Sequence, residues 1–291
     1  MTFLVERLFR LLSVVPLIFL HSVGWLMGWV AFALSSRYRM RLMANVRQAG
    51  LDTGVSFASV GEAGKMVAEL PRLWLGRISR IGWEGAAHIE AAQAHGNGLL
   101  LLTPHLGCFE ICARAYAEKF GDAKPITVLF RPPRQKPLQG LAAQARVRPG
   151  LHTAPTSLAG VKQLIKALKA GDVVGLLPDQ VPPDGQGVWA PFFGRDAYTM
   201  TLSARLAHTS NVKLLLIWGE RLSWGRGYIV RVRPFEGVLS RDPVEAAGQI
   251  NQAMESLIKE RPGQYLWSYN RYKPPSADHQ RVTPSRSGEA Q

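Results

Sequence analysis

The stretch Gly98–Ala115, with the sequence GLLLLTPHLGCFEICARA, decides the fold of this chain. Its first six residues, Gly98–Thr103, form an apolar run without alternation, which predicts a β-strand that is buried on both faces. Pro104 and Gly107 then mark a turn, and the periodic segment Phe109–Phe120 predicts a helix. A doubly covered strand that feeds a helix through a tight turn is typical of an α/β sheet.

The same alternation of apolar runs and amphipathic stretches continues along the chain. We therefore predict an α/β fold with a mixed, partly parallel sheet that is flanked by helices. The other predicted strands are Pro125–Phe130, Asp172–Leu177, Val212–Trp218 and Tyr228–Val232. The other predicted helices are Ala86–Ala94, Lys136–Arg146, Ser157–Ala170, Thr199–His208 and Val244–Glu260.

The amino-terminal segment is apolar enough to enter a membrane. Residues 11–36 contain no Asp, Glu, Lys or Arg, and about 20 apolar residues suffice to cross the hydrocarbon core. A retained anchor is favoured over a cleaved signal peptide because the run is long and arginines follow it directly, at 37, 39 and 41. These arginines predict that the body of the protein lies in the cytoplasm. A shallow interfacial helix stays open as the alternative to a transmembrane helix, since Pro16 interrupts the run.

These patterns predict four parts of the chain: a membrane anchor (1–36), a helical membrane-proximal segment (37–80), an α/β domain (81–273) and a polar, disordered tail (274–291). The 291 residues are 47% hydrophobic, which excludes a disordered or low-complexity protein. Their formal charge of +14 indicates an anionic partner. The two cysteines, Cys108 and Cys112, exclude a disulfide scaffold, and with His105 they have poor spacing for zinc.

His105 and Glu110 are the candidate catalytic residues, because they lie where the strand ends and the helix begins. Strand ends of α/β sheets are where active sites form. Five residues on an ideal helix separate two side chains by about 140°. The two therefore meet only if His105 lies in the turn and Gly107 lets the chain bend back. We predict that Glu110 then accepts a hydrogen bond from one imidazole nitrogen and leaves the other as a general base.

Four further segments, taken in order with the H-x4-E spacing, carry a family resemblance. They are FRPPRQKPL (130–138), LLPDQ (176–180), GVWAPFFGRDAYT (187–199) and QYLWSYNRYK (264–273). With RMRLMANV (39–46), the chain resembles the lipid A late acyltransferases, the lauroyl and myristoyl transferases within the wider lysophospholipid acyltransferase group. The resemblance implies acyl transfer from acyl carrier protein to a hydroxyl of a lipid A precursor at the inner membrane, without a metal or redox cofactor.

The same motifs supply candidate substrate-binding residues. Arg131, held beside two prolines, suits an oxyanion or a phosphate, and Arg134 extends the same patch. Asp179 and Gln180 follow another apolar strand. Asp179 is suited to bind a sugar hydroxyl or to hold Arg131. The alternative is that Asp179 only caps a turn. The sequence departs from the family where Val181–Pro183 precede Asp184, and where Trp267–Arg271 stand for the usual W-x-H-R-R. These departures bear on the identity of the substrate more than on the reaction.

The basic residues predict where an acidic partner binds. Residues 124–150 hold six Lys or Arg and no acid, and Lys162, Lys166 and Lys169 share one helix face. They suit acyl carrier protein or anionic headgroups, whereas no nucleic-acid-binding signature is present. Three alternatives stay open: another acceptor such as a glycerophospholipid or amino lipid, an inactive adaptor that holds acyl carrier protein, and a lipid hydrolase.

Overall fold

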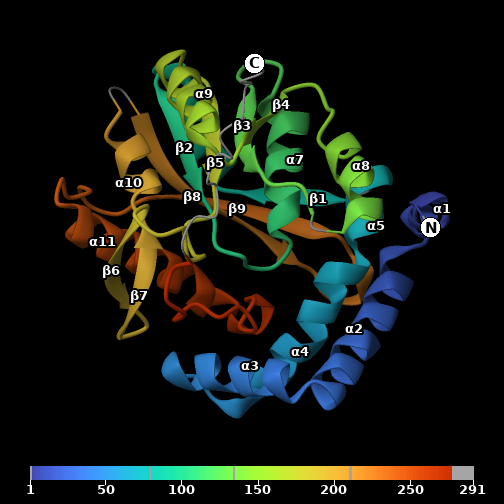
Figure 1. Cartoon of the computed structure of the whole chain (residues 1–291). Coiled ribbons are helices and arrows are strands. Elements are labelled where there is room, and N and C mark those ends of the chain that lie inside the picture. Colours follow the sequence, from blue (N-terminus) through green and yellow to red (C-terminus); the bar gives the residue numbers. More distant parts are fainter. Residues whose placement is uncertain (1, 79, 134, 210–211, 277–291) are drawn as a thin grey trace, which may run out of the picture.

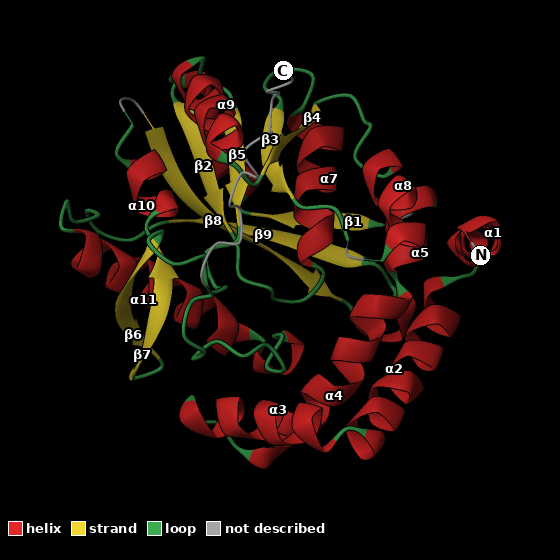
Figure 2. Ribbon diagram, viewed as in Figure 1, coloured by secondary structure: helices red, strands yellow, loops and turns green. Residues whose placement is uncertain are grey.

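A computed structural model describes residues 2–78, 80–133, 135–209 and 212–276 of the chain. These residues form a seven-stranded mixed sheet with helices on both faces and a separate two-stranded hairpin (Figures 1 and 2). The predicted α/β class is therefore confirmed. The strands of the main sheet are β1 (Ile81–Glu84), β2 (Gly98–Leu102), β3 (Ile126–Phe130), β4 (Leu151–Pro155), β5 (Val173–Leu176), β8 (Val212–Arg221) and β9 (Tyr228–Pro234).

The order of strands is β1-β9-β8-β2-β5-β3-β4, with β2 at the centre. Strand β2 pairs in parallel with both β5 and β8, and β3 pairs in parallel with β5 and β4. Only the β8–β9 pairing within this described sheet is antiparallel. The carboxyl ends of β2, β5, β3 and β8 therefore meet at one edge of the sheet, where the loops that follow them lie side by side.

Both faces of the sheet are covered, which explains the uninterrupted apolar run of β2. Leu99 and Leu101 point into the core on one face, and Leu100 and Leu102 into the core on the other. The first face carries α5 (Leu70–Leu75), α6 (Ala86–Ala94), α7 (Phe109–Phe120) and α8 (Lys136–Gln144). The second carries α9 (Leu158–Lys169), α10 (Leu202–Ala207) and α11 (Pro243–Glu260).

The amino-terminal third is helical, as the sequence predicts. Its helices before α5 are α1 (Thr2–Val14), α2 (Leu17–Leu34), α3 (Ser36–Gln48) and α4 (Thr53–Ala68). Helix α2 is long and apolar enough to be a candidate membrane span. Figure 1 shows that α2 and α4 run beside each other along one side of the α/β body. The helical segment is interrupted between Ala68 and Leu70, just before Pro71, which lies in the first turn of α5, where proline is tolerated.

The sequence prediction is wrong around Thr199, where a helix was expected to begin. The chain there forms the hairpin of β6 (Gly187–Phe192) and β7 (Arg195–Met200), and α10 starts only after it. The Thr199 side chain is buried in β7 and caps no helix. The short edge strands β1 and β4 were also missed. The predicted tail lies outside the described residues from 277 onward, and the four-part division stays a prediction.

Candidate active site

His105 lies in a rigid loop between β2 and α7, at the carboxyl edge of the sheet. Gly107 holds this loop in shape with φ of +60°, and a Cβ there would meet the Gly219 carbonyl oxygen at 2.1 Å. The Gly107 amide donates to the Gln264 carbonyl at 2.9 Å, and the Leu266 amide donates to the His105 carbonyl at 3.1 Å. The turn thus requires glycine and is fixed from both sides.

Asp179 is the carboxylate that holds the imidazole. It follows β5, and its side chain is 1% exposed. One oxygen accepts from the backbone amide of His105 at 2.8 Å, and the other lies 2.7 Å from Nδ1 of the ring. An ionised carboxylate only accepts hydrogen bonds, so Nδ1 carries the proton and Nε2 keeps its lone pair.

Gln180 lies at the free nitrogen of the ring. Its side-chain nitrogen is 3.0 Å from Nε2 of His105, which fits an amide that donates to the lone pair. The imidazole is therefore bonded on both sides, and its ring also packs against Phe109 at a tilt of 59°, with centroids 4.7 Å apart. These contacts fix the orientation of the ring.

The surroundings of Asp179 keep it ionised. Burial raises the pKa of this carboxyl, but the hydrogen bonds and charge of His105, together with the charge of Arg271, outweigh burial and leave the pKa lowered. The pKa of the nearby Tyr265 phenol is raised instead, because of burial and the negative charge of Asp179. The site therefore combines a fixed negative charge with a neutral hydrogen-bond donor.

The structure differs from the sequence prediction at Glu110. Its carboxylate accepts from Arg146 at 3.0 and 3.1 Å, and the hydrogen bond that we expected from His105 goes to Asp179 instead. The Arg146 guanidinium also stacks on Phe130, 4.4 Å from the ring centroid. Glu110 lies in the first turn of α7 and binds Arg146 in the turn after α8, so it does not hold Nδ1 of the ring. The predicted pairing of His105 with Glu110 is therefore wrong, and Asp179 takes this place.

The predicted basic patch lies at the same edge of the sheet. Arg131 directly follows β3, whose carboxyl end neighbours that of β5, and the side chain is exposed. No hydrogen bond from Arg131 to Asp179 occurs among the residues described. Arg134 lies outside the described residues, and its role stays a prediction.

Comparisons with known proteins identify the family of the chain. Residues 52–274 match the model of the family described as bacterial lipid A biosynthesis acyltransferase. The chain belongs to this family. It is 31% identical over 224 residues to the lipid A biosynthesis lauroyltransferase of Escherichia coli K12, which is 75% of this chain and 70% of that protein. It is also 26% identical over 223 residues to the palmitoleoyltransferase of the same organism, covering 75% and 70% of the two chains, and 24% identical over 215 residues to its myristoyltransferase, covering 72% and 65%. The chain is thus an acyltransferase.

Residues from two family motifs of this acyltransferase make hydrogen bonds that fix the segments beside the site. The Tyr269 hydroxyl accepts from the Val181 amide at 2.9 Å, which fixes the loop after Gln180. The Asn45 side chain donates to the carbonyls of Trp267 and Tyr269 at 2.6 and 2.8 Å. Both residues lie within motifs that carry the family resemblance, yet nothing in the sequence gave them these contacts.

Arg271, from the same carboxy-terminal motif, is 2% exposed. It donates to the Tyr198 carbonyl at 2.7 Å and to the Thr199 hydroxyl at 2.6 Å. The motif residue thus joins the hairpin β6–β7 to the site, and its charge contributes to the lowered pKa of Asp179. The buried Thr199, which was expected at a helix start, is its partner.

A buried ion-pair network that the sequence did not reveal supports the His105 loop. Arg221, at the end of β8, donates to Glu69 at 2.5 and 2.9 Å and to Glu62 at 2.7 Å. The same guanidinium donates to the Gly107 carbonyl at 3.0 Å. Glu69 also accepts from the Tyr228 hydroxyl and lies 3.0 Å from Nε2 of His21. The pKa of Glu69 is lowered to about 2, because its charged partners outweigh burial. Helix α2, which carries His21, is thereby connected to the catalytic loop.

Several residues near the site are apolar or uncharged. Cys108 precedes α7 and Cys112 lies within it; both are buried, and burial raises the pKa of Cys112 to about 12, so neither thiol is reactive. Phe192 and Phe193 are buried and pack in the core. Trp189 is 48% exposed on β6.

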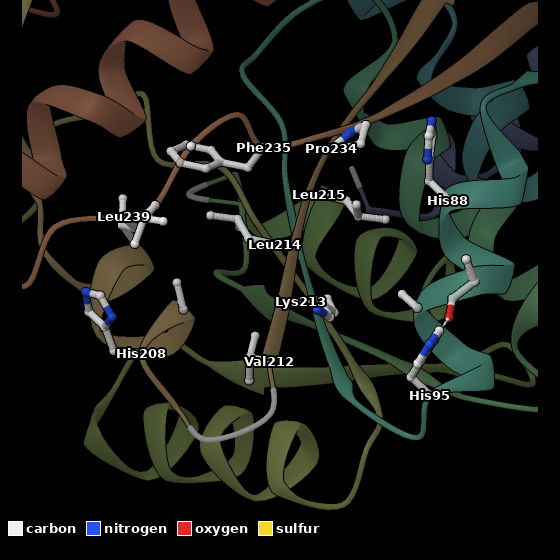
Figure 3. A pocket seen from close by; sticks show the side chains of 15 residues that line it. His88, His95, His208, Val212, Lys213, Leu214, Leu215, Pro234, Phe235 and Leu239 are labelled. Carbon is white, nitrogen blue, oxygen red and sulfur yellow. Dashed lines mark hydrogen bonds between the residues drawn. The ribbon is translucent and has the colours of Figure 1, made fainter.

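A cleft of about 560 Å³ lies away from this site (Figure 3). It is lined by Val212, where β8 begins, and so lies at the amino edge of the parallel strands, opposite His105. Figure 3 shows His88, His95 and His208 spread around it rather than converging. Within the described part of the chain, no cluster of His, Cys, Asp and Glu could hold a metal ion.

Proposed function

We propose that this acyltransferase moves a fatty acyl chain from acyl carrier protein to a hydroxyl of a lipid A precursor, as a late secondary acylation at the cytoplasmic face of the inner membrane. The family and the activities of its relatives support the lipid A acceptor. The observation that carries the mechanism is the His105 ring, which buried Asp179 holds at Nδ1 and which Gln180 contacts at Nε2.

In the proposed reaction, the acceptor hydroxyl replaces the Gln180 amide at Nε2 of His105. Nε2 takes the hydroxyl proton while the oxygen attacks the thioester carbonyl carbon. The resulting tetrahedral oxyanion collapses, the C–S bond breaks, and the carrier thiolate recovers the proton from the imidazolium. Asp179 stabilises that imidazolium without itself becoming protonated. The Ser of a G-x-S-x-G elbow is not part of this sequence, and direct transfer requires no acyl-enzyme.

Arg131, Arg134 and Gln180 bind substrate in this proposal. Arg131 is exposed at the edge of the sheet that carries His105, where a guanidinium suits the phosphate of the acceptor or the developing oxyanion. Gln180 both donates and accepts, so it can hold the acceptor hydroxyl once displaced from the ring. We assign Glu110 a positioning role: it holds Arg146 and so joins α7 to the turn that follows α8.

The basic face of α9 is the proposed dock for acyl carrier protein. Lys162, Lys166 and Lys169 are all exposed, as the helical spacing predicts. Helix α9 follows β4, so it begins at the edge of the sheet where His105 lies. An acidic carrier bound along this helix would present its thioester to that edge.

A transfer assay with purified protein tests the proposal. The substrates are acyl carrier proteins loaded with several chain lengths and a lipid A precursor, and wild type is compared with His105→Ala. We expect acyl-lipid product from the wild type alone, with unchanged thermal unfolding of the variant. Near-normal transfer by His105→Ala would refute the base assignment.

The products also separate the alternatives. Free fatty acid in place of acylated lipid would identify a hydrolase, and binding of the carrier without turnover on any acceptor would identify an adaptor. Mass spectrometry of lipids from a deletion strain distinguishes the acceptors. Lipid A that lacks one secondary acyl chain supports this proposal, whereas an altered glycerophospholipid or amino lipid supports another acceptor.

A further inference from the structure

We infer that α1, the outer face of α2 and the β8–β9 turn around Trp224 form one membrane platform, which lies in the plane of a single anionic leaflet. Helix α2 does not cross the bilayer in this arrangement. The inference deepens the membrane association in the proposed function and rests on it. It is tested below by measurements that do not depend on acyl transfer.

Helix α2 contacts other parts of the protein near both of its ends, the β8–β9 turn at its start and α4 at its end. Near its start, Gly225 of the β8–β9 turn lies so close that an added Cβ would meet the Ile18 backbone nitrogen at 2.3 Å. Near its end, a Cβ on Gly28 would meet the Val60 carbonyl oxygen at 2.2 Å, and Trp29 stacks on Phe57. A helix that crosses a bilayer projects from its soluble domain and touches it at one end. Its 18 residues also rise only about 27 Å, short of the roughly 30 Å hydrocarbon core.

The inner face of α2 is bound to a charged cluster. His21 is 4% exposed and lies 3.0 Å from Glu69, which is itself paired with the buried Arg221. Inserting α2 into hydrocarbon would either break this contact or carry a buried ion-pair network into lipid. The helix stays attached if only its outer face meets the membrane.

That outer face is apolar along its whole length, and α1 continues it. The helix is apolar all round, yet only one stripe of it is buried: Leu17, Leu20, His21, Gly24 and Gly28. Water-soluble surfaces rarely expose a contiguous apolar area of this kind. The large apolar residues that α1 and α2 expose are Phe3, Leu4, Leu8, Leu11, Val14, Ile18, Phe19, Val23, Trp25, Leu26, Met27, Val30 and Leu34. Figure 1 shows α1 and α2 at the outside of the molecule, with α4 between α2 and the body.

The β8–β9 turn adds an aromatic residue in a costly conformation. Trp224 is 80% exposed and has φ of +60°, a left-handed backbone that glycine adopts freely and tryptophan rarely does. In water, no contact of the exposed indole with the described part of the chain offsets the cost of this backbone conformation, whereas tryptophan is enriched at the membrane interface. The turn packs against the start of α2, so its indole belongs to the same surface.

Arginines flank this surface on more than one side, which favours an anionic leaflet over an apolar protein partner. Arg7 and Arg10 are exposed on α1, Arg226 beside Trp224, and Arg37 directly after α2. Cations thus stand at both ends of α2. A spanning helix concentrates them at its cytoplasmic end, whereas a helix in the plane meets headgroups at both ends.

Trp224→Gly is the sharpest test, because glycine suits this backbone. We expect an unfolding midpoint equal to or above that of the wild type, together with about tenfold weaker partition onto phosphatidylcholine vesicles that contain phosphatidylglycerol. Val238→Ala, at an 89% exposed apolar residue, is the matched control and should partition like the wild type. Turnover of a detergent-dispersed acceptor should be unchanged in both variants, so failure of the platform is separable from failure of the proposed function. Equal partition of the two variants would overturn the role of Trp224.

Labelling tests whether α2 crosses the bilayer. Single cysteines at Arg7→Cys and Arg47→Cys flank α2, and the two native cysteines are buried. We expect a membrane-impermeant maleimide to label both sites in everted inner-membrane vesicles and neither in spheroplasts. Labelling of Arg7→Cys in spheroplasts alone would show a spanning helix and overturn the inference.

Discussion

Two carboxylates differ in their relation to His105, the proposed base, and also in burial and in the residue that they bind. Asp179 is 1% exposed and binds both the backbone and the ring of His105. The Glu110 side chain is 26% exposed and binds Arg146, which lies in the turn that follows α8. Asp179 reaches the ring from 74 residues away, whereas Glu110 is five residues away. The difference teaches that the loops at adjoining strand ends, and not spacing along the chain, select the partner of the imidazole.

The largest effect is expected from His105 itself. His105→Ala should lower kcat by about 10³-fold, because general base catalysis contributes about 10²–10⁴-fold. The variant should keep the wild-type thermal unfolding midpoint, since the side chain lies at the edge of the core. Single-turnover transfer from an acyl carrier protein thioester measures the effect. A loss of less than about tenfold would mean that neither carboxylate orients a catalytic base.

Asp179→Asn sharpens the comparison at the buried carboxylate. The amide keeps the shape but removes the charge that stabilises the imidazolium and fixes the tautomer. We expect kcat to fall by about 10²-fold with little change in KM, which is the pattern of an interaction made in the transition state. Steady-state kinetics with varied acceptor measures the two separately. A rise in KM at unchanged kcat would instead make Asp179 a residue that binds the acceptor.

Glu110→Gln is expected to have a smaller effect, about tenfold or less, because Glu110 holds Arg146 and not the ring. Arg146→Gln should behave alike, and the double variant should cost no more than either single change, since the two residues share one interaction. If Glu110→Gln lowers kcat as much as Asp179→Asn does, the two carboxylates do not differ in their effect on catalysis. The hydrogen bond to His105 would then move to Glu110 when substrate binds.

Sequence reasoning found most elements that carry the site but not the contacts between them. The run Gly98–Thr103 predicted β2, and Phe109–Phe120 predicted α7 with the observed bounds. These succeeded because a strand covered on both faces and a helix with one buried face have distinct apolar periods. His105 and Asp179 were both singled out, since each follows a buried strand. Their pairing depends on strand order, which the local pattern does not contain.

The elements and contacts that the sequence did not predict also depend on tertiary structure. The edge strand β4, Leu151–Pro155, buries only two of its five residues and contains proline, so it lacks an apolar run. Thr199 precedes a helix, as a cap would, but tertiary contacts with Arg271 place it in a strand. The Arg221–Glu69 network joins residues 152 positions apart, and a lone arginine at a strand end gives no sign of it.

The smallest predicted effect extends the comparison to a second buried carboxylate, Glu69, through the pH dependence of stability. Its pKa is about 2 in the folded protein against 4.5 ordinarily, because Arg221 and His21 outweigh burial. A lowered pKa stabilises the fold above pH 4.5, and this contribution is lost as the pH falls toward 2. The unfolding free energy should therefore be about 1 kcal/mol lower at pH 4 than at pH 7 through Glu69 alone.

Urea unfolding of Glu69→Gln and the wild type at both pH values measures this difference. Glu69→Gln should be less stable at pH 7, because Arg221 is left buried beside an uncharged partner, but its stability should depend less on pH by about 1 kcal/mol. Glu110→Gln is the matched control, and its stability should follow the pH as that of the wild type does. An equal pH dependence in Glu69→Gln and the wild type would mean that folding does not lower the pKa of Glu69. The ion pair with Arg221 would then add little to stability, and the rigidity of the His105 loop would need another source.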